Sequence, residues 1–591
     1  MAFLRHRQQM NMTFSASEAS RQGGFAAAIK SPLFLLGLAL VAVCVLLALP
    51  LAAPIGPMYW DVFIYYDAAN RIFDGQVPAN DFFTPVGPLG YYLFAGWLWL
   101  FPNAQPTLIA HWSLLAATAP LMALVLWDVG KRSRGLGFAL LVPFLVFALL
   151  PFNTREFYPF PGSDAFGIYN RQVCQVLYVL VAALVFVCNR QLLVILITLS
   201  MTALFFLKIT GFAAGGVIAL YAFLAGRVQF RHAVASALAF LAVIGALQLY
   251  NGIVGTYLAD ILRLVDKNAG TLLPRFLQAA SINFGAVLAT TSLALLLLWS
   301  DRREIAAQFA AQRETSTISA LSDLLDHHGF WLLAVLFAGI LFETQNTGSQ
   351  AFIFLWPAVL AALAARIRPG AGSPLRLGIV VLAAATIVPA VLGVTERAAR
   401  AYIGAVKNER LKQRNLGPLG AVNMRSEVAV RVDHMQRFYP AHRSLYEDLT
   451  AADELATPML YSDYDFQIGY LISVDDAIDA IRELESDKGV HFETLMSLNF
   501  VNPFPWLMNR SAPLQIAIGA DPMRAVPDLT LDETKAVSET DLVLLPTCPP
   551  TTANAMLYDH YKDALTQHRR IRLDDCYDAF VNPKFLGALD K

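Results

Sequence analysis

The sequence has little charge. Only 15% of its 591 residues are charged while 56% are hydrophobic, and the mean hydropathy is +0.50. Soluble domains carry about 25% charged residues, so this composition excludes a soluble multidomain enzyme and indicates a polytopic α-helical membrane protein. The formal net charge is -1, and no basic stripe with interleaved aromatic residues is present. A nucleic-acid partner is therefore not expected.

Cysteine is also scarce, with five residues in the whole chain. No Cys-x-x-Cys pair and no histidine cluster with ligand spacing occurs, so the sequence predicts no metal site. Cys44, Cys174 and Cys188 lie in apolar runs and are expected to be small core residues. Cys548 and Cys576 lie in a polar region, where an oxidising compartment allows them to pair. A disulfide and two free thiols both remain open, because a sequence does not show whether two Cα atoms approach each other.

Long apolar runs dominate the sequence. Residues 1–30 are polar, and the run at 32–53 that follows is expected to be an uncleaved first span, since Pro54 follows the small residues where cleavage would occur. Ten further runs bring the expected number of spans to about eleven; they lie near 105–129, 135–152, 172–188, 192–207, 211–226, 233–253, 284–299, 330–345, 351–365 and 375–394.

The distribution of lysine and arginine predicts the topology. Short loops near 131–134, 190, 227–231 and 366–376 carry basic residues, so the positive-inside rule places them in the cytoplasm. The N-terminal segment 1–30 is then cytoplasmic, and residues 31–395 form a transmembrane domain of the inner membrane. The outer loop 54–104 and the segment 396–591 lie on the periplasmic side.

One outer-loop segment, from Tyr59 to Tyr92, has the features of a site. Residues 60–73 have helical periodicity and predict an amphipathic surface helix, with Asp67, Asn70, Arg71 and Asp74 on one face and Ile64, Ala68 and Ile72 on the other. Asp61 falls on the apolar face. A carboxylate there is costly unless it is used, so Asp61 is either a catalytic group or a helix cap.

The same segment resembles a known family. An aspartate shortly after a first span, a juxtamembrane helix and the re-entry sequence TPVGPLGYY at 84–92 are similar to the first periplasmic loop of the GT-C glycosyltransferases, among them the lipid A aminoarabinose transferases and the protein O-mannosyltransferases. The resemblance implies inverting sugar transfer from a polyprenyl-phosphate donor to a glycan, lipid or protein acceptor, with Asp61 as the base. Those families often carry an acid, an arginine and a lysine where this chain has Val62, Ile64 and the Thr84-Pro85 region, so partners of the phosphate must come from elsewhere.

Two further acidic positions are candidates for substrate binding in other outer loops. In FNTREFYPFPGSDAFGIYNR at 152–171, Asp164 or Glu156 is expected to orient the acceptor or to lie near Asp61, unless each is a solvated loop charge. Glu343 opens the polar run ETQNTGSQ at 343–350. Such a run suits the recognition of sugar hydroxyls, and it is equally compatible with an ordinary polar loop.

Three cations are candidates for contacts with the donor. Arg171 opens a helix at the membrane surface, where a guanidinium can bind a phosphate through two hydrogen bonds. Lys208 lies between two apolar runs and is expected either to contact the phosphate or to extend towards water. Arg263 belongs to the amphipathic loop 254–283, which either flanks the lipid donor or is a structural interfacial helix.

The segment after residue 395 changes composition. The sequence predicts a helix continuing out of the membrane and then, over 420–591, an α/β domain with strands at 458–463, 514–520 and 541–546 and helices at 475–487 and 553–568. No glycine-rich phosphate loop follows these strands, so no nucleotide cofactor is indicated. The run NFVNPFPW at 499–506 is either a corner of the core or a platform for sugar rings. The domain is expected to cap the site or to bind the acceptor.

Two other function classes remain open. A transporter or flippase of a lipid-linked glycan would carry charges deep within its spans and repeated halves. A polysaccharide polymerase or ligase would favour paired arginines and a histidine in one large outer loop. The charges of this chain gather in its outer loops and no repeat is evident, which favours a glycosyltransferase.

Overall fold

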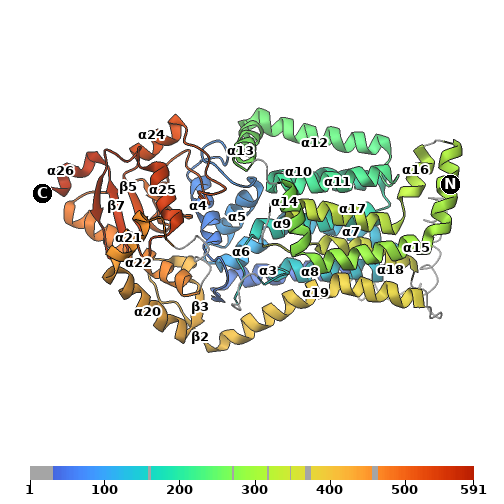
Figure 1. Ribbon diagram of the computed structural model, residues 1–591, viewed down its shortest axis with the longest axis horizontal. Helices are drawn as coiled ribbons and strands as arrows, with labels where there is room; N and C mark the ends of the chain where they lie inside the picture. Colours follow the sequence, from blue (N-terminus) through green and yellow to red (C-terminus); the bar gives the residue numbers. More distant parts are fainter. Residues whose placement is uncertain are drawn as a thin grey trace.

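The computed structural model describes residues 31–156, 162–268, 272–315, 318–345, 348–366, 374–455 and 464–590. Long helices lie side by side in one half of the molecule, and the C-terminal residues form a mixed domain at one end of this bundle (Figure 1). The helices α4, α5 and α6 lie between these two parts. Residues 1–30, predicted to be cytoplasmic, fall outside the described residues, as does the strand predicted at 458–463.

The helical part begins with α3 (Pro32–Ala48), whose N-terminus is capped by the Ser31 side chain. The helices that follow are α4 (Asp61–Phe73), α5 (Leu89–Leu100), α6 (Pro106–Trp112), α7 (Leu115–Gly130), α8 (Arg134–Leu149), α9 (Ile168–Phe186), α10 (Arg190–Leu207), α11 (Ile209–Leu224), α12 (Phe230–Asn251), α13 (Ile253–Lys267), α14 (Leu272–Ile282), α15 (Phe284–Thr315), α16 (Ile318–Leu325), α17 (His328–Glu343), η1 (Ile353–Leu355), α18 (Trp356–Arg366) and α19 (Pro374–Gly404).

Five helices of the described chain are long and apolar enough to cross a membrane, namely α9, α10, α12, α15 and α19. The predicted span at 105–129 is divided between α6 and α7, which meet at a bend of 40° and would make a sixth. Several other predicted spans correspond to apolar helices of 10–17 residues, which are short for a hydrocarbon layer about 30 Å thick. The structure thus supports a helical membrane protein, and the number of eleven spans stays a prediction.

Helix α9 is the centre of the bundle. In its most apolar stretch 94% of the residues are buried inside the protein, against 6% in α12, which lies at the edge. Figure 1 shows α12 above α10 and α11, with its far side uncovered. Because α12 is apolar and contacts the rest of the protein along one side only, its uncovered surface is of the kind that lipid covers.

The C-terminal part contains β2 (Asn408–Arg410), η3 (Gly417–Gly420), β3 (Val422–Arg425), α20 (Ser426–Ala441), α21 (Arg443–Ala451), α22 (Tyr464–Lys488), β4 (Leu495–Ser497), α23 (Phe504–Met508), α24 (Leu531–Glu539), β5 (Leu542–Pro546), α25 (Thr552–Tyr561), β6 (Arg569–Arg572), β7 (Tyr577–Val581) and α26 (Leu586–Leu589). Its main sheet has the order β4-β5-β7-β6, with β4 parallel to β5 and the other pairs antiparallel.

This domain corrects three sequence predictions, namely one strand and the bounds of two helices. The strand predicted at 541–546 is present as β5, but residues 514–520 form a loop. That loop uses its amides elsewhere, because the N–H groups of Gln515 and Ile518 donate to the carbonyls of Asp81 and Phe83 in the first outer loop. The helix predicted at 475–487 extends from Tyr464 to Lys488, and the one predicted at 553–568 ends at Tyr561.

The first outer loop is joined to the C-terminal domain at several points between β1 and Phe83. β1 (Ala53–Pro54) pairs in parallel with β3. The hydroxyl of Tyr59 donates to the carbonyl of Leu419 over 2.8 Å, and the side-chain amide of Asn70 donates to the carbonyl of Arg510 over 3.0 Å. The prediction of a surface helix is therefore wrong, since the domain covers the polar face of α4 and leaves only its C-terminal end exposed.

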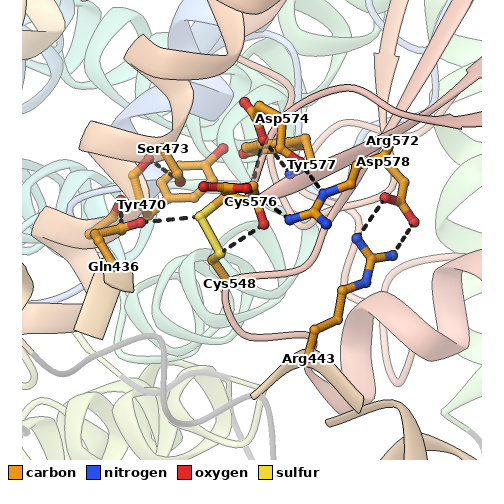
Figure 2. Close-up of a disulfide and its surroundings, with 12 residues drawn as sticks. Gln436, Arg443, Tyr470, Ser473, Cys548, Arg572, Asp574, Cys576, Tyr577 and Asp578 are labelled. Carbon is orange, nitrogen blue, oxygen red and sulfur yellow. Dashed lines mark hydrogen bonds and ion pairs between the residues drawn. A yellow bond between two sulfur atoms is a disulfide. The ribbon is translucent and has the colours of Figure 1, made fainter. Parts of the chain in front are cut away.

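A disulfide joins Cys548 to Cys576 with a Cα–Cα distance of 4.9 Å, as one of the two sequence alternatives predicted. It fixes the loop after β5 to the segment that leads into β7. Figure 2 shows the bond between Gln436 on one side and Asp574 on the other. Asp574 accepts hydrogen bonds from the backbone N–H groups of Cys576 and Tyr577, which holds this turn in place.

Candidate active site

A cavity of about 830 Å³ opens where the outer loops meet the C-terminal domain. Its wall is assembled from the N-terminal turn of α4, the start of α9, the break between α10 and α11, the helices α13 and α14, the loop after α17 and the C-terminal domain. The ionisable side chains that line it are Asp61, Arg155, Tyr169, Lys208, Tyr257, Arg275, Glu343, Asp521 and Arg524.

Asp61 is the first residue of α4 and lies at the cavity wall, with 8% of its surface exposed. One carboxylate oxygen accepts a hydrogen bond from the backbone N–H of Gly167 over 3.3 Å. The other oxygen, Oδ1, is buried and has no hydrogen-bond partner among the described residues. Helix α4 has no side-chain cap at its own N-terminus, so the geometry does not support Asp61 as the cap of this helix.

Burial gives this carboxyl the properties of a base. Desolvation raises the pKa of Asp61 to about 7; the nearby charge of Asp164 acts in the same direction, and the hydrogen bond from Gly167 opposes it. A group with a pKa near 7 is both available as a base and basic enough to accept a proton at neutral pH. Perturbed carboxyls of this kind in a cavity are typical of functional sites.

Gly167 positions the start of α9 against Asp61. Its φ of +66° lies in the left-handed region that favours glycine. A Cβ at this position would lie 2.1 Å from the carbonyl oxygen of Gly348, so no other residue fits the approach. The glycine thus allows the second outer loop, the loop after α17 and Asp61 to meet at one point.

Asp164 lies near Asp61, as one of the sequence alternatives predicted, but it does not line the cavity. Its carboxylate accepts hydrogen bonds from the side-chain amide of Asn153 over 2.6 Å and from the N–H of Phe166 over 2.9 Å. Burial raises its pKa, and Arg171 and Arg397 oppose that shift. Asp164 therefore supports the loop beneath Asp61.

Arg171 does not fit the predicted contact with a phosphate. Its side chain is 0% exposed, and it donates to the carbonyls of Asp164 over 2.6 Å and Phe166 over 2.9 Å and to the side chain of Asn153 over 3.2 Å. Its Nε donates to His111 of α6 over 3.4 Å. With its donors used by the second outer loop (residues 152–171) and by α6, the guanidinium holds the fold of that loop rather than a ligand.

Lys208 does line the cavity. It follows α10 directly, its ammonium donates to Asn170 Oδ1 over 3.1 Å, and the same group lies 4.8 Å from the centre of the Tyr169 ring. Two further cations, Arg155 and Arg275, share the cavity with Lys208. Both belong to loops with candidate residues, 152–171 and 254–283, but the sequence did not predict either arginine as a site residue.

The other predicted site residues have different places. Glu343 lines the cavity, and its carboxylate accepts a hydrogen bond from the hydroxyl of Ser349 over 2.6 Å. Glu156 pairs with Arg400 over 3.5 Å and lies outside the cavity. Arg263 lies outside it too, because it forms an ion pair with Glu533 over 3.3 Å that ties α13 to the C-terminal domain.

The side of the cavity next to the bundle is apolar. Ile261 and Leu264 of α13, Leu272 of α14 and Leu341 of α17 line it. The outer faces of α13 and α14 also carry exposed leucines, such as Leu262. These two helices are therefore a thin apolar partition between the cavity and the surroundings of the bundle.

Sequence reasoning missed the contribution of the C-terminal domain. Phe500, Gly519, Asp521 and Arg524 line the cavity on the side opposite the bundle. Phe500 belongs to the run at 499–506, for which a platform for sugar rings is one of the two sequence alternatives. No sequence pattern marks Gly519, Asp521 or Arg524. Only the packing of residues 513–520 on the first outer loop shows that this segment belongs to the site.

Among the described residues, no three His, Cys, Asp or Glu side chains are gathered so that they could hold a metal ion. Comparisons of the chain with protein-family models, curated proteins and solved structures give no match.

Proposed function

We propose that the protein is a GT-C-like membrane glycosyltransferase that moves a sugar from a polyprenyl-phosphate donor to a hydroxyl acceptor. The observation that carries the proposal is Asp61, a buried carboxyl with an unpartnered oxygen at a cavity that also contains cations and an apolar wall. A base, a phosphate site and a place for a lipid chain are the three parts that this reaction requires. The resemblance of residues 84–92 to the GT-C loop supports the same function.

In the proposed mechanism Asp61 acts as the general base. The acceptor oxygen attacks the anomeric carbon of the donor while Asp61 takes the hydroxyl proton. A new carbon–oxygen bond forms on one face of the sugar as the bond to the phosphate breaks on the other, so the configuration inverts. The electron pair of the broken bond leaves with the lipid phosphate.

The cavity cations suit the leaving group. Lys208, Arg155 and Arg275 replace Arg171 as the proposed partners of the phosphate, since all three line the cavity. Fixed positive groups in a site that excludes water stabilise the charge that develops on a departing phosphate. Glu343, among these cations, is proposed to orient them or to bind sugar hydroxyls.

The apolar partition suits the lipid. A polyprenyl chain is too hydrophobic to lie in water, and the α13–α14 wall gives the cavity an apolar lining. We propose that the isoprenoid lies along this wall while its phosphate faces the cations. Arg263 then contributes indirectly, because its ion pair with Glu533 fixes the position of α13.

The proposed topology has about eleven spans, with residues 1–30 in the cytoplasm and the C-terminal domain in the periplasm of the inner membrane. The Cys548–Cys576 disulfide supports a periplasmic domain, because such bonds persist in oxidising compartments. The donor would be used on the outer face of the membrane.

We expect protein isolated without reductant to contain the Cys548–Cys576 bond, which mass spectrometry of alkylated peptides will detect. Replacing both cysteines by alanine should lower the free energy of unfolding by about 3 kcal/mol, since the bond closes a loop with a sequence separation of 28. Cys44→Ala is the matched control, because Cys44 is free and exposed on α3. Two alkylated thiols in the native protein would contradict the bond.

The pH dependence of transfer tests the base. Asp61 accepts a proton only when it is ionised, so kcat/KM should rise with pH, show an inflection near the pKa of about 7 and level off above it. Transfer by purified protein from an undecaprenyl-phosphate-linked sugar, followed between pH 5 and 9, measures this profile. A rate that falls with pH across this range would refute Asp61 as the base.

A further inference from the structure

The C-terminal face of the cavity offers a second set of ligand-binding groups. Phe500, Gly519, Asp521 and Arg524 line it, and all four come from loops outside the sheet. The segment that carries Arg524 also contacts the end of α13, because the side-chain amide of Asn268 donates to the carbonyl of Arg524 over 3.2 Å. A molecule that reaches Asp61 from this side must therefore contact them.

These groups are held at a fixed position relative to α4. The N–H of Ile518 donates to the carbonyl of Phe83, and the N–H of Ala520 donates to the carbonyl of Phe500. Gly519, between these two residues, has a φ of +60°, and a Cβ there would lie 3.1 Å from Ile64, one helical turn after Asp61. The loop thus covers the same turn of α4 that carries the base.

Phe500 supplies an apolar surface beside Asp61. Its ring lies 6.4 Å from the ring of Trp60, the residue directly before Asp61, in an edge-on arrangement. Phe500 is half-buried and lines the cavity. An aromatic ring fixed in this way offers a flat surface against which the apolar face of a sugar ring can pack.

Arg524 supplies a charge with unused donors. Its Nε donates to Asp521 Oδ2 over 3.0 Å, and its side chain is 66% exposed. Its two terminal Nη groups make no hydrogen bond to any described residue, so the fork of the guanidinium is open towards the cavity. The other oxygen of Asp521 accepts from the N–H of Met523 over 3.0 Å, which fixes the carboxylate that orients the arginine. An open guanidinium fork binds carboxylates and phosphates through two parallel hydrogen bonds.

We propose that Phe500 and Arg524 form the acceptor subsite, and that the acceptor is an anionic sugar bearing a carboxylate or phosphate group. The proposal rests on the proposed function, because it divides the cavity into a donor side at Lys208 and an acceptor side at Arg524. The sugar ring packs on Phe500, its anionic group binds the Arg524 fork, and one hydroxyl faces Asp61.

Binding of small sugars to the full-length protein in detergent tests this division. We expect methyl β-glucuronide or glucose 6-phosphate to bind at least about tenfold more tightly than methyl β-glucoside, as a charge-assisted hydrogen bond implies. Saturation-transfer NMR titrations measure all three. Preference for the glucuronide would identify a carboxylate ligand, and preference for the phosphate would identify a phosphorylated one. Equal affinity for the three probes would overturn the proposal.

Variants then separate the two sides. Arg524→Gln should abolish the preference for the anionic sugar and leave the affinity for undecaprenyl phosphate unchanged, whereas Lys208→Gln should do the reverse. Phe500→Ala should weaken all three sugars, and Arg569→Gln, partly exposed on β6 and outside the cavity, should change nothing. If Arg524→Gln weakens undecaprenyl phosphate as Lys208→Gln does, Arg524 belongs to the donor side and the proposal fails. Failure of the wild type to bind undecaprenyl phosphate would instead refute the proposed function, since the sugar titrations use no donor.

Discussion

Asp61→Asn is expected to reduce sugar transfer by about 10²- to 10⁴-fold, because it removes the proposed general base while preserving the shape of the side chain. Asparagine can still accept the hydrogen bond from Gly167 through its amide oxygen. Binding of undecaprenyl phosphate should survive, since a carboxylate repels the phosphate rather than attracting it. Retained binding without turnover also separates an enzyme from a transporter, in which bound lipid is moved without chemistry.

The same variant should not lose stability. The folded-state pKa of Asp61 is raised from 3.8 to about 7, so the native state binds more protons than the unfolded state between these values. Stability of the wild type therefore falls as pH rises through this window, and above pH 7 the buried charge remains a cost. Asp61→Asn has no such charge and should melt at the same or a higher temperature at pH 8. A lower melting temperature would favour a structural role for the carboxylate.

Asp74→Asn is the matched control for both measurements. It makes the same chemical change at the C-cap of the same helix, at an exposed residue that does not line the cavity. Its transfer rate should stay within about twofold of the wild type, as expected for a surface substitution away from the site. An equal loss in the two variants would show that the effect of Asp61→Asn is not specific to the base.

Arg171→Met is expected to cost about 3–5 kcal/mol of stability, because it leaves Asp164 buried beside Asp61 without its nearest cation. The carbonyl of Asp164 and the side-chain oxygen of Asn153 lose their donor at the same time, and the carbonyl of Phe166 keeps only the hydrogen bond from the Asn153 amide. Thermal unfolding in detergent measures the loss, and Arg171→Lys should rescue only part of it because an ammonium lacks the planar fork.

Arg414→Gln is the control for this loss. Arg414 pairs with Asp479 at the surface over 2.7 Å, with its side chain 76% exposed, and exposed ion pairs contribute little. We expect its melting temperature to match the wild type. If Arg171→Met folds with the wild-type melting temperature and instead weakens undecaprenyl phosphate, Arg171 binds the donor and its structural role is wrong.

The sequence predicted only the part of the site that a single segment, residues 60–73, encodes. Residues 60–73 have the periodicity of a helix, and α4 extends from Asp61 to Phe73. Asp61 could be identified as a candidate site residue because it falls on the apolar face of this helix, where burying a carboxylate costs free energy. The surroundings of this helix were not identifiable, since a polar face looks the same in sequence whether water or another domain covers it.

Arg171 and residues 514–520 show why the rest of the site could not be predicted from the sequence. The sequence shows that Arg171 opens a helix, but not that the carbonyls just before it in the chain turn back to accept its hydrogen bonds. Residues 514–520 have the composition of a strand, yet their amides bond to Asp81 and Phe83, more than 400 positions earlier in the chain. Arg524 follows this segment with no periodicity to mark it. Contacts between segments so far apart carry no local signal.

The pairing of β1 with β3 also sets the order in which a new molecule matures. Tyr59, two residues before the base, is fixed by the carbonyl of Leu419, which emerges from the ribosome 360 residues later. At about 5–20 residues per second this interval is roughly 20–70 s. Through this time the loop that carries Asp61 lacks the contacts that hold it, and Asp61 gains its environment only after the C-terminal domain has been made. A chain whose synthesis stops before this domain therefore has an incomplete cavity.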